Sequence, residues 1–256
     1  LDPGECEAVA TWSPCRPASA GLSTWPSRVS RASPPAPRVK AKSAAFRSFP
    51  CLRPTPDRAP ASPRGVILVV DNYDSFTFNL VQLLRSVAGD GAEVRVVPHD
   101  AYTADTLLGW HPSHVVISPG PGSPVDAGVS LAVMARSRVP TLGVCLGHQC
   151  LGALYGAEVV RGAAPVHGRA SAITHTGEGL FEGVPQGFLA ARYHSLVVNP
   201  LTIPDALEAT AWSDDGALMG LRARDCPWRV GVQFHPESVL TPEGPRLVRN
   251  FLAGKM

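Results

Sequence analysis

One cysteine of this 256-residue chain stands in a setting that suits a nucleophile. Residues 143–147 read GVCLG, with Cys145 in the middle, and they join the apolar run at residues 141–144 to a helical pattern. This G-x-C-x-G spacing is that of a nucleophile elbow with cysteine in place of serine, because the flanking glycines allow a tight strand-to-helix turn. The N-terminus of the following helix favours the thiolate, which is the form that attacks. The pattern therefore predicts covalent catalysis by Cys145.

A nucleophilic cysteine needs a base, and the chain offers eight histidines. His235 follows the apolar run at residues 230–234, so it lies at the end of a predicted strand, as Cys145 does. Glu237, two residues further on, can accept a hydrogen bond from the imidazole and fix its tautomer. His148 is the rival base, although its place in the turn beside Cys145 favours a ring that points elsewhere. The residues favour a Cys145-His235-Glu237 triad.

A stiff loop follows another predicted strand. Residues 118–124 read SPGPGSP, in which proline fixes φ and glycine permits close approach of the backbone. Such a loop can hold a backbone N–H where charge develops in a tetrahedral intermediate, and one donor of this kind contributes about 10²–10³ in rate. The loop lacks the lysine of GxxxxGK[ST], so the pattern argues against a phosphate-binding loop.

Short apolar runs that alternate with helical patterns must position these residues. Strand-like runs occur at residues 66–70, 93–97, 114–117 and 141–144. Helical spacing is present between residues 80 and 87, where Leu80, Leu83, Leu84 and Val87 recur, and again at residues 129–136. Continuous apolar strands indicate burial on both faces, which is typical of a parallel sheet covered by helices.

Beyond Leu151 the segments are typical of antiparallel strands. They lie at residues 170–174, 188–193, 206–212, 217–222 and 228–234. A last helix is expected to bury Leu247, Val248, Phe251 and Leu252. We therefore expect an α/β protein with a mixed, largely parallel central sheet and flanking helices.

Composition divides the chain near residue 65. Residues 1–64 hold 12 of the 26 prolines, only eight Leu, Ile, Val or Phe, and ten basic against four acidic residues, whereas residues 65–256 hold 13 basic and 17 acidic residues. The first part has too little apolar surface to offset the entropy of ordering, so we predict a disordered arm at residues 1–64 and one folded domain at residues 65–256.

The arm leaves two interpretations open. It is Arg-rich, Ser-rich and acid-poor, as organellar transit peptides are, but the chain starts at Leu1, and an extended reading frame gives a similar composition. We expect a cytoplasmic protein, or a plastid or other organellar one if the arm is a transit peptide. Its basic residues are spread singly, which argues against nucleic-acid binding, and no apolar stretch approaches the roughly 20 residues of a membrane span.

Five motifs together resemble the class I glutamine amidotransferases, over about residues 65–254. In chain order they are DNYDSFTFN at 71–79, SPGPGSP at 118–124, GVCLGHQ at 143–149, RYHSL at 192–196 and QFHPES at 233–238. The resemblance implies a flavodoxin-like architecture with a nucleophile elbow. Within this family the motifs look like those of the small subunits of aminodeoxychorismate synthase and anthranilate synthase.

The resemblance also implies a role for each matching residue. Cys145 would be the nucleophile, His235 the base and Glu237 its orienting partner. The N–H groups of two residues, Gly120 and Leu146, would form the oxyanion hole. Three further positions would hold L-glutamine: Gln149 and the backbone at Ser195 and Leu196. No metal ligand is implied, and the cysteines show no zinc-binding spacing.

The implied reaction is hydrolysis of glutamine to glutamate through a glutamyl thioester. The ammonia would pass to a chorismate-utilising synthase, as a separate subunit or a fused domain, because no pattern in this chain suits chorismate and magnesium. We thus expect no cofactor on this chain and magnesium on the partner. Residues 192–196 and 212–222 favour the aminodeoxychorismate type, and anthranilate synthase, or service to both, is the alternative. A non-catalytic regulatory module and a stand-alone γ-glutamyl hydrolase are the competing functions.

Overall fold

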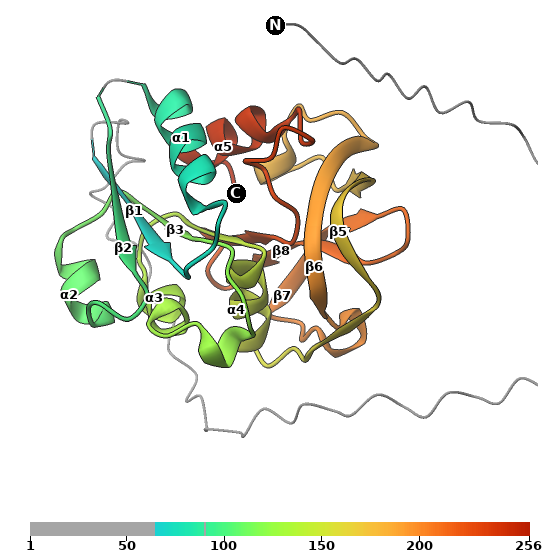
Figure 1. Cartoon of the computed structure of the whole chain (residues 1–256), viewed down its shortest axis with the longest axis horizontal. Coiled ribbons are helices and arrows are strands. Elements are labelled where there is room, and N and C mark those ends of the chain that lie inside the picture. Colours follow the sequence, from blue (N-terminus) through green and yellow to red (C-terminus); the bar gives the residue numbers. More distant parts are fainter. Residues whose placement is uncertain (1–64, 90) are drawn as a thin grey trace, which may run out of the picture. The chain divides into compact units, whose positions relative to one another are not determined.

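The structure is a computed structural model that describes residues 65–89 and 91–256. The predicted disordered arm at residues 1–64 lies outside the described residues. Within the described part, one nine-stranded sheet has the strand order β2-β1-β3-β4-β9-β8-β7-β5-β6. Helices cover both faces of this sheet (Figure 1). The expected α/β class with a mixed central sheet is confirmed.

Half of the sheet is parallel. It contains β1 (Val66–Asp71), β2 (Glu93–Pro98), β3 (His114–Ile117), β4 (Thr141–Val144) and β9 (Arg229–Val232). Side chains alternate between the two faces of β1, and all four central ones are buried: Ile67 and Val69 belong to one apolar cluster, Leu68 and Val70 to the other. Burial on both faces explains the continuous apolar runs in the sequence.

The other half of the sheet is antiparallel. It contains β5 (Val159–His175), β6 (Phe188–Val198), β7 (Leu207–Ser213) and β8 (Leu218–Ala223), and β8 pairs with β9 where the halves meet. The sequence placed the start of β5 at Ala170, which was wrong by 11 residues. The missed portion is mostly exposed and pairs with β6 through irregular register, so it has no apolar alternation to reveal it.

Two groups of helices complete the layers. One face carries α1 (Thr77–Ala88) and α5 (Gly244–Leu252), and the other carries α2 (Ala104–Gly109), α3 (Ser130–Arg136) and α4 (Leu146–Leu154) (Figure 1). In α5, Leu247, Val248 and Phe251 are buried as expected, while Leu252 is only partly buried. The sequence missed α2, a helix of six residues with only two buried side chains. The described residues also form three short 3-10 helices, η1 (Pro124–Asp126), η2 (Gly179–Phe181) and η3 (Pro200–Thr202).

Parallel pairing brings the strand ends that matter to one edge of the sheet. Val70 pairs with Ile117, Ile117 with Gly143, and Val144 with Val232. The residues that follow these strands therefore gather at the carboxyl edge, where open α/β sheets bind their ligands. In the described part of the chain, no helix is long and apolar enough to cross a membrane.

Candidate active site

Cys145 sits at a strained turn between β4 and α4. Its φ of 52° and ψ of −97° lie outside the usual regions for a residue with a side chain. Its N–H donates to the Val232 carbonyl at 2.8 Å, which anchors the turn to β9. A Cβ at Gly143 would lie 2.3 Å from the Gly147 carbonyl oxygen, and a Cβ at Gly147 would lie 2.6 Å from that of Ile117. The G-x-C-x-G spacing is thus a steric requirement of the turn.

His235 lies three residues beyond β9 and is 1% exposed. Its N–H donates to the Ala191 carbonyl of β6 at 3.0 Å, and its ring Nδ1 lies 2.6 Å from Glu237 Oε1. The Glu237 side chain is also buried. A carboxylate on Nδ1 leaves Nε2 as the free nitrogen, and that atom makes no hydrogen bond to any nitrogen or oxygen of the described residues. The ring is therefore oriented with Nε2 available for chemistry.

The electrostatics at His235 favour a protonated ring. Burial lowers its pKa, but the side chains of Cys145 and Glu237 outweigh burial and raise the pKa from 6.5 to about 10. Because the Cys145 side chain contributes to the raised pKa of His235, its sulfur lies near this imidazole. At neutral pH the ring carries a proton that it can give to a leaving group, as a general acid does.

The rival base, His148, lies in different surroundings. It is fully buried in α4 and packs against the backbone of β9, where a Cβ at Gly231 would lie 3.2 Å from its Nδ1. Neither ring nitrogen has a hydrogen-bond partner among the residues the structure describes. Burial lowers its pKa to about 4, so the ring is neutral. These surroundings favour His235 as the titrating partner of Cys145.

Gly120, one of the two expected oxyanion-hole residues, lies close to the side chain of the other, Leu146. A Cβ at Gly120 would lie 2.8 Å from Leu146 Cδ2 and 2.5 Å from Asn72 Cβ, so only glycine fits there. Asn72 supports the loop: its N–H and Nδ2 donate to Ser118 at 2.8 and 2.9 Å, and its Oδ1 accepts from Ser130 at 2.7 Å. The opening motif thus braces the SPGPGSP loop, a role that the sequence reasoning did not assign to Asn72.

Gln149 bridges the two halves of the sheet. Its Nε2 donates to the Leu196 carbonyl at 3.1 Å and to Gln233 Oε1 at 3.2 Å. Gln233 in turn directs its own Nε2 to Cys145 Sγ at 3.5 Å. The expected residues Gln149 and Leu196 are therefore linked to the sulfur by a chain of hydrogen bonds through Gln233, and the exposed Ser195 precedes Leu196 in β6.

The sequence reasoning missed Gln233 as a site residue. A usable signal was present, because Gln233 stands two residues before His235, and alternate residues of an extended segment face the same side.

Two aromatic rings were also missed. Phe76 and Tyr193 pack against the His235 ring, with centroids at 6.0 and 5.0 Å, and against each other at 4.9 Å. All five motifs thus meet around Cys145.

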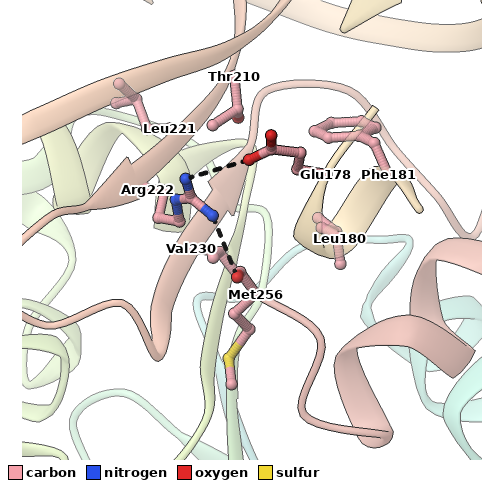
Figure 2. Close-up of a pocket in the computed structure, with 8 residues that line it drawn as sticks. All are labelled: Glu178, Leu180, Phe181, Thr210, Leu221, Arg222, Val230 and Met256. Atoms are coloured by element: carbon pink, nitrogen blue, oxygen red, sulfur yellow. Dashed lines mark hydrogen bonds and ion pairs between the residues drawn. The ribbon is translucent and has the colours of Figure 1, made fainter. Parts of the chain in front are cut away.

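A small pocket is present elsewhere in the domain (Figure 2). It shares no lining residue with the Cys145 site. Its guanidinium, from Arg222, is already paired with Glu208 at 2.8 Å and with the Met256 carbonyl at 3.2 Å. Among the described residues, no group of three His, Cys, Asp or Glu side chains is arranged to hold a metal ion.

The fold and site define an α/β protein with a cysteine nucleophile elbow backed by a histidine–glutamate pair. Residues 68–254 match the family model for glutamine amidotransferase class-I, and the chain belongs to this family. Members of this family are enzymes, and the chain is therefore a glutamine amidotransferase by its sequence as well as by its fold.

Relatives agree with the family. The chain is 47% identical over 203 residues to the bifunctional protein TrpGD of Thermotoga maritima, covering 77% of this chain but only 34% of that one. It is 47% identical to aminodeoxychorismate synthase component 2 of Escherichia coli, with 73% and 99% of the two chains covered. It is 44% identical to aminodeoxychorismate/anthranilate synthase component 2 of Bacillus subtilis, with 73% and 95% covered.

A solved structure shows the same fold. A Thermoplasma acidophilum protein that is described as a candidate GMP synthase component superimposes with a TM-score of 0.65 at 27% identity. The match covers 74% of this chain and 92% of that chain. The fold is therefore shared beyond the relatives that are most similar in sequence.

Proposed function

We propose that this chain is the glutaminase component of a chorismate-aminating synthase, which hydrolyses L-glutamine to glutamate and delivers the ammonia to a synthase subunit or fused domain. The observation that carries the proposal is the buried Cys145-His235-Glu237 arrangement, with Nδ1 of His235 held at 2.6 Å from the carboxylate. Family membership supports the glutamine substrate. The printed names of the relatives support the synthase partner.

The reaction starts with attack of the Cys145 thiolate on the side-chain amide carbon of glutamine. The N–H groups of Gly120 and Leu146 stabilise the negative charge on the amide oxygen. His235 then gives its Nε2 proton to the departing nitrogen, so that the C–N bond breaks, ammonia leaves and a glutamyl thioester remains. Water attacks the thioester, His235 accepts its proton, and glutamate leaves as the thiolate re-forms.

The remaining groups of the site position the reactants. Glu237 holds the imidazole in one orientation and favours the imidazolium. Gln149, with the backbone at Ser195 and Leu196, holds the glutamine. The chain carries no cofactor in this proposal, and magnesium belongs to the synthase partner.

The preferred partner is aminodeoxychorismate synthase. The relative of that name in Escherichia coli, which is 47% identical, supports the choice. Residues 192–196 and 212–222, which look more like that type, point the same way. Service to anthranilate synthase as well is the second candidate, favoured by the Bacillus subtilis relative whose name includes both activities. We place the protein in the cytoplasm, or in a plastid or other organelle if residues 1–64 act as a transit peptide.

The first prediction tests the mechanism. In the complex with the synthase subunit, Cys145→Ser should lower glutamine-dependent synthesis by at least about 10³-fold and leave ammonia-dependent synthesis intact, because only the nucleophile is lost. Both activities are measured as product formed with glutamine or with an ammonium salt. Loss of both activities in Cys145→Ser would contradict the assignment.

Glutamate release by the wild-type chain, with and without the synthase subunit, separates the competing functions. Partner-dependent release supports the proposal, equal release alone supports a stand-alone hydrolase, and no release supports a regulatory module. Synthase subunits of the aminodeoxychorismate and anthranilate types, supplied in parallel, test the pathway. Anthranilate formation without aminodeoxychorismate would overturn the preferred partner while leaving the glutaminase mechanism standing.

A further inference from the structure

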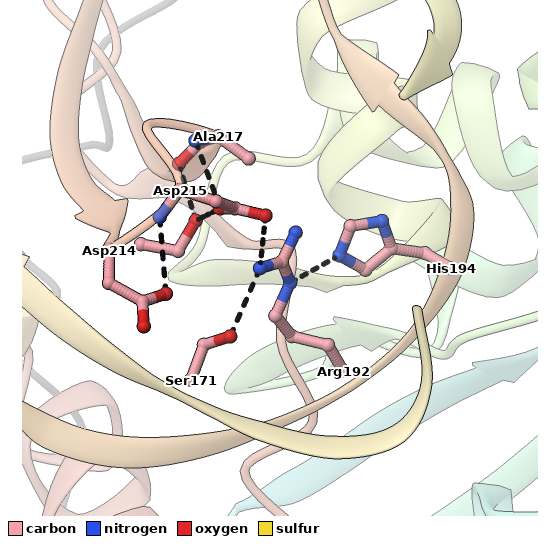
Figure 3. Close-up of polar contacts among 7 residues, drawn as sticks. Ser171, Arg192, His194, Asp214, Asp215 and Ala217 are labelled. Atoms are coloured by element: carbon pink, nitrogen blue, oxygen red, sulfur yellow. Dashed lines mark hydrogen bonds and ion pairs between the residues drawn. The ribbon is translucent and has the colours of Figure 1, made fainter. Parts of the chain in front are cut away.

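The mechanism leaves unused a buried arginine that joins two segments of the antiparallel half of the sheet. Arg192 opens the RYHSL motif in β6 and is 3% exposed. Its Nη1 donates to Asp215 Oδ2 at 2.9 Å and to Ser171 Oγ at 3.1 Å, and its Nε donates to His194 Nε2 at 3.1 Å (Figure 3). Asp215 lies in the hairpin between β7 and β8. Residues 192–196 and 212–222, the two segments whose sequence favours the aminodeoxychorismate type, are therefore linked through the Arg192 guanidinium.

The hairpin presents Asp215 in a fixed orientation. The Asp215 carboxylate accepts hydrogen bonds from Ser213 Oγ and, at 3.4 Å, from the Ala217 N–H, while Arg192 binds its other oxygen. Burial raises the pKa of Asp215, but the bonds from Ser213 and Arg192 outweigh it and lower the pKa, so the group is ionised at neutral pH. The result is a charge-assisted bond between a buried cation and a half-exposed anion.

The same guanidinium determines the state of His194. Because Arg192 Nε is a donor, His194 Nε2 must be an acceptor, which leaves the ring neutral with its proton on Nδ1. Burial, then Arg192, then His235 lower the pKa of His194 to about 4. The ring next to the catalytic histidine therefore stays uncharged.

Arg192 and His194 stand directly before the proposed glutamine-binding backbone. Ser195 follows His194, and the Leu196 carbonyl accepts the bond from Gln149 at 3.1 Å. A β-strand held at residues 192 and 194 has little freedom at residues 195 and 196, since consecutive peptide planes share the same extended backbone. We therefore expect a shift of Arg192 to move the carbonyl that Gln149 binds.

We propose that Arg192, anchored by Asp215, is a positioning residue for the glutamine substrate, because it fixes the strand segment whose backbone at Ser195 and Leu196 holds that substrate. The inference rests on the proposed function. Arg192 touches neither the sulfur nor the catalytic imidazole in its hydrogen bonds. Its loss should therefore weaken binding of glutamine and leave the chemical step almost unchanged.

The test uses Asp215→Asn, which removes the anchoring charge at a half-exposed position, and Arg192→Lys, which keeps the charge but not the three-way geometry. Glutaminase kinetics of the full complex should show KM for glutamine raised at least about 5-fold with kcat within about twofold, the pattern expected when binding alone is lost. Asp214→Asn is the matched control, because Asp214 is exposed in the same hairpin and, among the described residues, its side chain accepts a hydrogen bond only from the Asp215 N–H. Its KM should equal that of the wild type.

A second readout measures binding without turnover. In a Cys145→Ala background, calorimetric titration with glutamine should show a Kd raised by the same factor in the Asp215→Asn and Arg192→Lys variants. A folded variant pair with lower melting temperature but unchanged KM and Kd would overturn the inference and leave Arg192 a purely structural residue. A fall in kcat with KM unchanged would also overturn it.

If Arg192→Lys does not fold, Asp215→Asn decides alone. If the wild-type protein binds glutamine but does not hydrolyse it, the proposed function is wrong. The Kd values of the variants would still test whether Arg192 positions the glutamine-binding strand.

Discussion

The parallel and antiparallel halves of the sheet place their site residues by different means. In the parallel half, backbone geometry sets the positions: Cys145 is held at a turn that tolerates no side chain at Gly143 or Gly147, and Gly120 approaches Leu146 as only glycine can. In the antiparallel half, side-chain bonds to other segments hold the strand that leads to Ser195 and Leu196, as in the bonds from Arg192 to Ser171 and Asp215. The first kind of control acts through close backbone contacts, which the side-chain bonds of Asn72 reinforce, and the second depends on side-chain bonds to other elements.

His235 stands where the halves meet. It follows β9, the last parallel strand, and its backbone bridges to Ala191 in β6. Thr241 closes the joint, since its hydroxyl accepts from the Ala191 N–H at 2.9 Å and donates to the His235 carbonyl at 2.7 Å. The comparison therefore predicts the largest effects for changes to backbone geometry in the parallel half and smaller effects for single bonds at the joint.

The largest effect is expected for Gly143→Ala. The new methyl group would lie 2.3 Å from the Gly147 carbonyl oxygen, which is backbone and cannot move without opening the turn at Cys145. We expect a loss of unfolding free energy on the order of 3 kcal/mol and no detectable glutaminase activity. Urea denaturation and glutamate release measure the two. Gly109→Ala is the control, because its added Cβ meets no atom within 4 Å and the position is helical. An active, stable Gly143→Ala protein would contradict backbone control.

An intermediate effect is expected for Glu237→Gln at the joint. The carboxylate both orients the His235 ring and raises its pKa, so the neutral amide should lower kcat/KM by at least about 10²-fold. The pH dependence of stability should change as well. Because the folded-state pKa of His235 is raised to about 10, its contribution is fully present below pH 6.5 and is lost as the pH rises towards 10.

The unfolding free energy of wild type should therefore fall more steeply between pH 6.5 and 10 than that of Glu237→Gln. Denaturant titrations at pH 6 and pH 9.5 measure the difference, which we expect to be at least about 1 kcal/mol smaller in the variant. Equal slopes for the two proteins would mean that Glu237 does not stabilise the imidazolium.

The smallest effect is expected for Thr241→Val. The substitution keeps the shape of a 2%-exposed side chain but removes both hydroxyl bonds between β6 and His235. We expect a loss of about 1–3 kcal/mol of stability, because the Ala191 N–H loses this hydrogen bond and the His235 carbonyl keeps only the one from the Ser238 N–H at 3.3 Å, with a modest fall in activity. Thr174→Val is the control, since that threonine is exposed and its one bond is 3.4 Å long. A larger loss of activity in Thr241→Val than in Glu237→Gln would break the proposed order.

Much of the parallel half was predictable from the sequence. The strands at residues 114–117 and 141–144 were found with their observed bounds, and the elbow cysteine was identified from its two glycines. The antiparallel half was predicted less well, because β5 was placed 11 residues too late. The helix α2, beside the parallel strands, was missed for the same physical reason. Short or exposed elements bury few apolar side chains, so they have no strong periodicity.

The sequence by itself determined the order of elements, the nucleophile elbow and the motif residues that meet at the site. Each of these depends on a window of a few residues, within which the turn residues and the spacing of apolar residues can be recognised. The tertiary structure alone decided which of the side chains at the site contact one another. Gln149 meets Gln233 across 84 residues, and Arg192 meets Asp215 across 23. Contacts of this kind exist only after the sheet has formed and has brought distant strands into register, so no local sequence pattern predicts them.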